Sequence, residues 1–85
     1  MSRLPQVSAR ECVKALQRGG FIQRRQTGSH IVMQRDDPYA VAVVPNHNPI
    51  GKGTLRSIIK QAGLTVDEFL TLLEGRKDKQ TPDTE

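Results

Sequence analysis

The chain of 85 residues contains a single cysteine, Cys12, so no disulfide can form within it. A protein of this size builds only a small core, and without a disulfide its fold depends on packing alone. A single cysteine is also typical of a reducing compartment rather than of a secreted protein. Because Cys12 falls among the apolar positions of a predicted helix, we interpret it as a core residue and not as a nucleophile.

Long apolar runs are missing as well. No segment approaches the roughly 20 apolar residues that cross a bilayer, and Arg3, Arg10 and Glu11 interrupt the region where a signal peptide carries its apolar stretch. We therefore expect a cytoplasmic protein without membrane contact. The length predicts one domain over residues 1–75. Residues 76–85 contain no apolar side chain, which predicts a disordered polar tail.

The side chains that build metal and nucleotide sites are scarce. The sequence has two histidines and no paired acidic cluster, whereas a zinc site needs three or four converging ligands. We therefore expect no metal and no other cofactor. The segment Gly51-Lys52-Gly53-Thr54 precedes a predicted helix, but its spacing is not that of a nucleotide-binding P-loop. It is interpreted either as a phosphate contact at a helix N-terminus or as a plain loop and helix cap.

Negative charge is the minority. The sequence contains 13 Lys and Arg against nine Asp and Glu, which gives a formal net charge of +4. Residues 1–35 contain seven basic residues and one acid, whereas residues 61–75 contain three acids and no base. Concentrated positive charge favours binding to phosphate backbones. The first part of the chain is therefore predicted to carry a nucleic-acid surface.

Hydrophobic periodicity, helix caps and turn residues predict six elements. The predicted elements are a helix over residues 8–18, strands over 21–26, 29–34 and 39–44, a second helix capped by Thr54 and ended by Gly63, and a third helix over 65–73. The turns between the strands are predicted at Thr27-Gly28 and at residues 35–38.

This order predicts an α+β fold, in which a three-stranded antiparallel sheet is covered by helices on one face. In the second strand, Ile31 and Met33 alternate with His30, Val32 and Gln34. Successive strand residues point to opposite faces, so the more apolar pair is predicted to face the helices and His30 to face away. The uncovered face is left for ligands.

The motif Gly28-Ser29-His30 places a hydroxyl and an imidazole beside a glycine turn, flanked by Arg24, Arg25 and Arg35. Histidine exchanges a proton near neutral pH. Arginine binds phosphate and offsets the charge of a transition state. The combination suits RNA cleavage without a metal ion. The alternative interpretation is a solvent-facing strand histidine without a catalytic role.

A second histidine, His47, lies in the loop after the third strand. It is interpreted either as a second acid or base or as an exposed loop residue. Ser29 is disfavoured as a nucleophile activated by His30, because adjacent strand residues point to opposite faces. We assign Gly28 and Ser29 to the support of the turn.

Several short motifs, taken together and in this order, resemble the HicA family of toxins. They are Gly20-Phe21, the segment from Gln26 to His30, Val44-Pro45-Asn46-His47, and the segment from Gly53 to Leu64. The resemblance runs from about residue 4 to residue 73. It implies a fold like that of the double-stranded-RNA-binding domain, with the order α-β-β-β-α and a C-terminal helix. It also implies an mRNA interferase that a HicB antitoxin holds inactive.

Position by position, the catalytic histidine of the family corresponds to His30, and the turn glycine before it corresponds to Gly28. The matched segment that begins at Gly53 lies at the entry to the second helix. Basic residues there are inferred to help bind RNA. These residues are Lys52, Arg56 and Lys60.

Two other functions stay open. The same fold without catalysis would bind RNA duplexes by shape and by contacts to the backbone, and such binding would survive the loss of His30. Residues 55–73 also read as a helix-turn-helix that binds DNA. The acids Asp67, Glu68 and Glu74 disfavour this last function, because a recognition helix faces phosphates.

Overall fold

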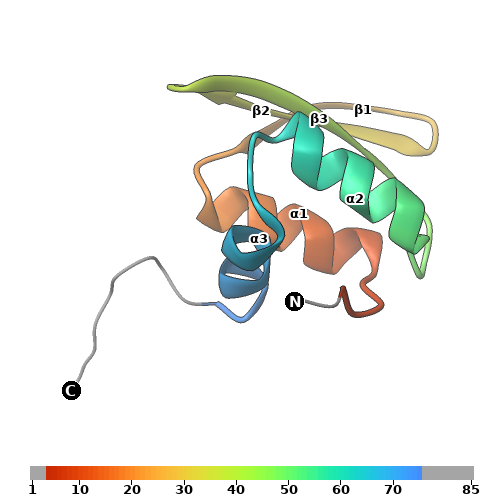
Figure 1. Ribbon diagram of the computed structural model, residues 1–85. Coiled ribbons are helices and arrows are strands. Elements are labelled where there is room, and N and C mark those ends of the chain that lie inside the picture. Colours follow the sequence, from red (N-terminus) through yellow and green to blue (C-terminus); the bar gives the residue numbers. More distant parts are fainter. Residues whose placement is uncertain (1–3, 76–85) are drawn as a thin grey trace.

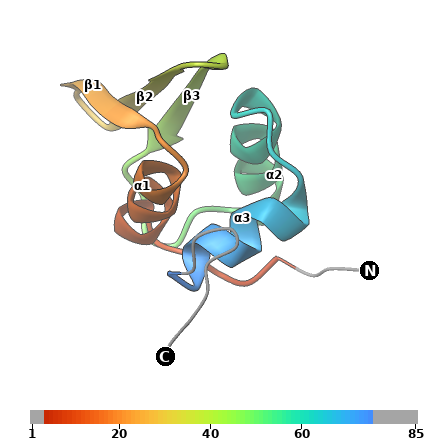
Figure 2. The same cartoon turned by 90° about the vertical axis from the view of Figure 1, so that its left-hand side faces the viewer.

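The computed structural model describes residues 4–75. The predicted polar tail at residues 76–85 lies outside the described residues. Three antiparallel strands form one sheet in the order β1-β2-β3, and the three helices lie on one face of it (Figures 1 and 2). The elements are α1 Ala9–Arg18, β1 Ile22–Thr27, β2 His30–Asp36, β3 Tyr39–Pro45, α2 Lys52–Gln61 and α3 Val66–Leu73. The predicted α+β class and element order are confirmed.

Two of the three helices begin as the capping boxes predict. In α1 the Glu11 N–H donates to Ser8 Oγ at 3.1 Å, and the Ser8 N–H donates to Glu11 Oε1 at 2.9 Å. The same reciprocal pair joins Thr65 and Glu68 at the start of α3. Each box satisfies two backbone N–H groups that a helix N-terminus otherwise leaves unpaired.

The prediction that Thr54 caps α2 is wrong. The helix begins at Lys52, its N-cap is Gly51, and no side chain caps it. The Leu55 N–H donates to the Gly51 carbonyl at 2.8 Å, so the first helical turn already closes over residues 51–55. Thr54 therefore lies inside that turn. Glycine is an acceptable N-cap, which is why the helix begins without a side-chain oxygen.

The predicted turns between the strands are each displaced. Thr27 pairs with His30, so the β1–β2 turn consists of Gly28 and Ser29 rather than Thr27 and Gly28. Gly28 has φ +54°, and a two-residue hairpin requires a positive φ at a central turn position. At the other end, pairing continues as far as Asp36 with Tyr39, so β2 ends two residues later than predicted.

The core fills the space between the sheet and the helices. Ile31 and Met33 point into it from β2, whereas His30 is exposed, as the alternation predicts. Cys12 has no exposed surface, and burial raises the pKa of its thiol to about 12. This environment fits its assignment to the core. Within residues 4–75, no helix has the length and apolar character that spanning a bilayer requires.

Candidate active site

His30 is the first residue of β2 and lies at one rim of the sheet. Its backbone pairs with Thr27 on one side and with Pro45 on the other, and its side chain is exposed. The Asn46 N–H donates to the Ser29 carbonyl at 2.6 Å. The turn that precedes His30 is thus fixed both by its own hairpin and by the chain that leaves β3. An imidazole on such a support is exposed but well positioned.

The loop that carries His47 is bonded to two other parts of the molecule. The Ala9 N–H, at the start of α1, donates to the His47 carbonyl at 3.2 Å, and the Ile50 N–H donates to the Val7 carbonyl at 2.8 Å. Together with the bond from Asn46, these contacts hold the loop between the β1–β2 turn and α1. His47 is exposed at the same end of the molecule as His30.

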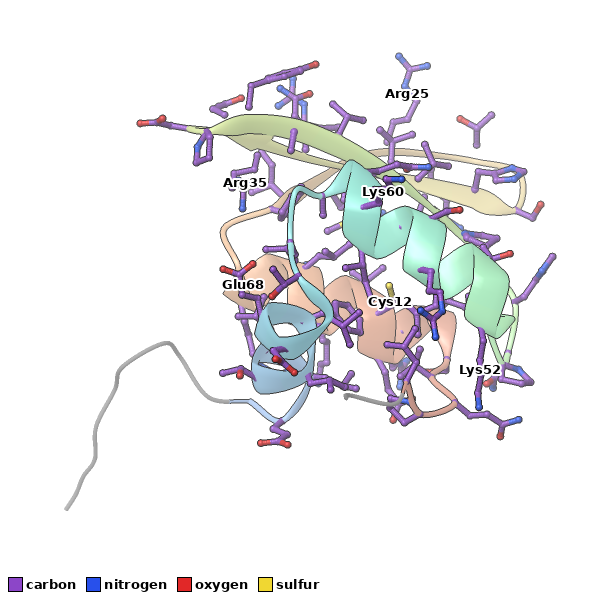
Figure 3. The ribbon with its side chains drawn as sticks, in the orientation of Figure 1. Cys12, Arg25, Arg35, Lys52, Lys60 and Glu68 are labelled. Carbon is purple, nitrogen blue, oxygen red and sulfur yellow. The ribbon has the colours of Figure 1, made fainter. Side chains whose placement is uncertain are left out.

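Arg25 lies on the face of the sheet that the helices leave uncovered. It pairs with Val32, which is two residues from His30 and therefore on the same face. Figure 3 shows its side chain projecting from the sheet away from the helices. Arg24 is also exposed and lies where the register between β1 and β2 shifts. Neither arginine makes a hydrogen bond or ion pair with any of residues 4–75.

Arg35 lies on the opposite face, at the far end of β2 from His30. Its Nε donates to the Pro38 carbonyl at 2.9 Å, and its Nη2 donates to the Ala62 carbonyl at 3.3 Å. Figure 3 shows the side chain between the sheet and the helices. Its donors are thus used to join the β2–β3 turn to the end of α2. The structure does not bring Arg35 together with His30.

The three basic residues of α2 are exposed and four residues apart, so each lies about 6 Å further along the helix than the one before. Lys52 stands at the end nearest the loop of His47 and points away from the sheet, whereas Lys60 stands near the other end (Figure 3). The helix has no acid in its first turn. The N-terminus of α2 therefore offers a cation and backbone N–H groups to an anion.

The predicted site residues consequently occupy three separate places. His30, Arg24 and Arg25 belong to the rim and to β1, the α2 cations lie on the helix side, and Arg35 lies half-buried on the face that the helices cover. The sequence does not predict the contact of Asn46 with the β1–β2 turn, because a backbone hydrogen bond between distant segments requires no particular side chain. The sequence predicts the uncovered face with Val32 on it, whereas the apolar residues of β3 on that face are not predicted. The alternation of Tyr39, Val41 and Val43 with Ala40, Ala42 and Val44 was the available signal.

The arrangement suits chemistry on a phosphodiester more than chemistry on a small enclosed substrate. His30 and His47 are exposed at one end of the molecule, and cations lie on both sides of that end. An imidazole transfers protons near neutral pH, and guanidinium groups bind phosphate oxygens. An exposed rim of this kind admits a long polymer, because both imidazoles are open to solvent.

Comparison with known proteins bears on which polymer chemistry is relevant. A search among curated proteins found no match to this chain. The model of a family described as "HicA toxin of bacterial toxin-antitoxin" matches residues 9–64, which is more than half of the chain. The match begins with α1 and ends just after α2, so it includes both histidines and all the cations discussed above. The chain therefore belongs to the HicA toxin family of bacterial toxin-antitoxin systems.

Proposed function

We propose that this toxin is an endoribonuclease that cleaves mRNA without a metal ion and thereby arrests translation, with His30 as its acid or base. The observation that supports this is the position of His30. Its exposed imidazole stands at the rim of the sheet in a HicA toxin, two residues along the strand from the partner of Arg25 and on the same face.

In the proposed reaction, the 2′-oxygen of a ribose attacks the adjacent phosphorus. The 2′-hydroxyl loses its proton to a base, the bond from phosphorus to the 5′-oxygen breaks, and that oxygen takes a proton from an acid. The products are a 2′,3′-cyclic phosphate and a 5′-hydroxyl. His30 performs one of the two proton transfers. Arg24 and Arg25 bind the phosphate and stabilise the charge that develops on its oxygens.

His47 is the candidate for the second proton transfer. Its loop is bonded to the β1–β2 turn through Asn46, so the distance between the two histidine backbones is fixed by the fold. A lysine such as Lys52, a water molecule or the substrate itself are the other sources of this proton. His47→Ala separates these cases, because only a catalytic His47 makes the loss of its imidazole lower kcat.

The remaining cations have different proposed roles. Lys52, Arg56 and Lys60 bind the RNA backbone outside the cleaved bond, since they lie along α2 and not on the face of His30. Arg35 is not proposed as an RNA ligand, because it lies on the face opposite His30 and two of its N–H groups bind backbone carbonyls. We further propose that the protein works in the cytoplasm and that its antitoxin is of the HicB type.

The proposal is tested by producing wild type and His30→Ala at equal levels in a bacterium, and by following growth together with intact mRNA. Arrest and loss of mRNA with wild type alone support cleavage by His30. Equal effects from both proteins would instead favour a binding module of the same fold without catalysis. Absence of any effect would contradict the toxin activity. Because His30 is exposed, its replacement leaves the core intact.

A further inference from the structure

The uncovered face of the sheet carries exposed apolar side chains. Within residues 4–75, the exposed large hydrophobic side chains are Ile22, Tyr39 and Val43, which are 51%, 70% and 37% exposed. Pairing and alternation place all three on the face that the helices leave uncovered, together with His30. Apolar surface that gathers on one face of a small protein usually marks a binding site.

Part of this face forms a row immediately next to His30. Val32 pairs with Arg25 on β1 and with Val43 on β3, so these three side chains cross the sheet side by side. The row lies two residues along β2 from His30, or about 7 Å. Strands are about 4.8 Å apart, so the row is wide enough for one flat ring. The row therefore consists of a flat apolar surface, formed by Val32 and Val43, with the cation of Arg25 at one end.

A β-bulge in β1 puts Arg25 in that row. Ile22 pairs with Gln34 and Arg25 pairs with Val32, so three steps on β1 correspond to two steps on β2. The register shift falls between Gln23 and Arg25, which makes Arg24 the extra residue. Without it, Ile22 and Arg25 would point to opposite faces, because side chains alternate along a strand. Bulges are frequent beside active sites, where they redirect a side chain.

We propose that the row of Arg25, Val32 and Val43 is a subsite for one unpaired nucleotide of RNA, adjacent to the phosphate on which His30 acts. The face of the base lies on the two valines, and the guanidinium of Arg25 binds the adjoining phosphate, on which His30 acts. This inference rests on the proposed function. The inference extends the proposed function by identifying where the RNA is bound and by requiring that the RNA be single-stranded at that point.

Two features favour RNA over a protein partner for this row. The row continues the face and the strand of His30, and Arg25 makes no hydrogen bond or ion pair with any of residues 4–75, so its donors are available to a phosphate. The requirement for a single strand follows from shape. A base offers its face to a flat sheet only when it is unstacked, and the deep, narrow major groove of an RNA duplex does not admit a sheet.

The test measures binding in a His30→Ala background, so that cleavage does not consume the RNA. Fluorescence anisotropy gives the affinity for a labelled ten-nucleotide single strand and for a ribose-phosphate backbone of the same length without bases. The variants are Val43→Ala and Arg25→Gln. Val41→Ala is the matched control, because Val41 has the same side chain on the same strand and face, one row further from His30.

We expect Val43→Ala to weaken binding of the base-carrying strand by about threefold to tenfold, because apolar contact with the base is lost. The same change leaves binding of the base-free backbone within twofold. Arg25→Gln weakens binding of both ligands by the same factor, since it removes a phosphate contact. Val41→Ala changes neither by more than twofold. Thermal unfolding verifies that each variant is folded, as expected for side chains on the outer face.

The proposal would be overturned if Val43→Ala and Val41→Ala weakened binding of the base-carrying strand equally. It would also be overturned if Val43→Ala weakened binding of the base-free backbone as much as binding of the base-carrying strand. Tighter binding of a duplex than of the single strand, or no binding of the single strand, would also overturn it and leave the face to a protein partner. Cleavage by the wild-type protein is measured separately. If the wild-type protein cleaves RNA but Val43→Ala does not weaken binding of the base-carrying strand selectively, only the subsite is contradicted. If Val43→Ala has that selective effect but the wild-type protein does not cleave RNA, only the proposed function is contradicted.

Discussion

The guanidinium carbon of Arg35 lies 4.7 Å from the centroid of the Phe21 ring, a cation–π contact in which the ring is almost completely buried. The same side chain binds the carbonyls of Pro38 and Ala62. Arg35 therefore joins three segments, namely the start of β1, the β2–β3 turn and the end of α2. An arginine held in this way stabilises the fold, and it lies on the face of the sheet opposite His30.

Replacing Arg35 is thus expected to affect stability and not RNA binding. Arg35→Ala removes two hydrogen bonds and the ring contact, which lowers the free energy of unfolding by about 2 kcal/mol. Arg25→Gln, at an exposed position without such contacts, changes it by less than about 0.5 kcal/mol. Urea unfolding of both variants measures the difference. If Arg35→Ala were as stable as wild type but bound RNA more weakly, Arg35 would instead be part of the RNA-binding site.

Glycine is predicted to be required at position 28 because of its backbone conformation, and not because a larger side chain would clash with neighbouring atoms. A Cβ at this position would meet no atom within 4 Å, but φ is +54°. Gly28→Ala therefore costs about 1 kcal/mol of stability and disturbs the direction of His30, which lowers RNA cleavage. Gly28→Asn, which tolerates this conformation better, retains more of both.

Gly53→Ala is the control for that experiment. Its added Cβ also meets nothing within 4 Å, and its φ is not in the left-handed region. Because Gly53 lies in α2, alanine stabilises the protein by roughly 0.5 kcal/mol. Thermal or urea unfolding of the glycine variants compares the two effects. If Gly28→Ala were as stable as Gly53→Ala, the turn would not depend on the positive φ.

The thiol of Cys12 is predicted to make stability depend on pH in the alkaline range. Burial raises its pKa from 9.0 to about 12 in the folded protein, while the thiol of the unfolded chain ionises at its ordinary value. Folding thus favours the protonated thiol. Its contribution to stability is complete below pH 9 and is lost as pH rises toward 12, by up to about 1.4 kcal/mol per pH unit.

Cys12→Ala, compared with wild type in urea unfolding between pH 8 and pH 11, isolates this contribution. The pH dependence that comes from all other titratable groups is the same in both proteins and cancels in the comparison. The difference in the free energy of unfolding between the two proteins is therefore expected to shrink steadily as pH rises above 9. A constant difference over that range would mean that the thiol is not protected by burial.

The cations of α2 are predicted to contribute unequally to RNA cleavage. Lys52 begins α2 shortly after the loop of His47, whereas Lys60 lies about 12 Å further along the helix axis. Lys52→Gln is expected to raise KM about threefold or more at low salt, and Lys60→Gln to raise it by only about twofold, because Lys60 binds the RNA backbone further from the cleaved bond. Steady-state cleavage of a labelled RNA measures both. Equal rises in KM from the two variants would contradict the unequal contributions of Lys52 and Lys60.

Much of the fold could be predicted from local sequence. The reciprocal caps at Ser8 and Thr65 gave two helix starts correctly, because each is made by residues three positions apart. The face of His30 followed from the alternation with Ile31 and Met33. The wrong start of α2 has the opposite cause. Gly51 caps that helix with its backbone alone, which no side chain in the sequence signals.

The candidate site was harder to assemble than the fold. Closeness in sequence suggests that Arg35 and His30 belong to one site, yet they differ by five positions along a strand and therefore point to opposite faces. Arg25 reaches the face of His30 only because of the bulge in β1, which depends on pairing with β2. Contacts between distant segments thus decided which of the predicted residues share a surface.

The most direct test of the central claim is cleavage of a single-stranded RNA by the purified protein in excess EDTA, with analysis of the new ends. Wild type is expected to produce 2′,3′-cyclic phosphate and 5′-hydroxyl ends, and His30→Gln to lose at least a hundredfold in kcat while unfolding at the same temperature. Undiminished cleavage by folded His30→Gln, or cleavage that requires an added metal ion, would contradict the account.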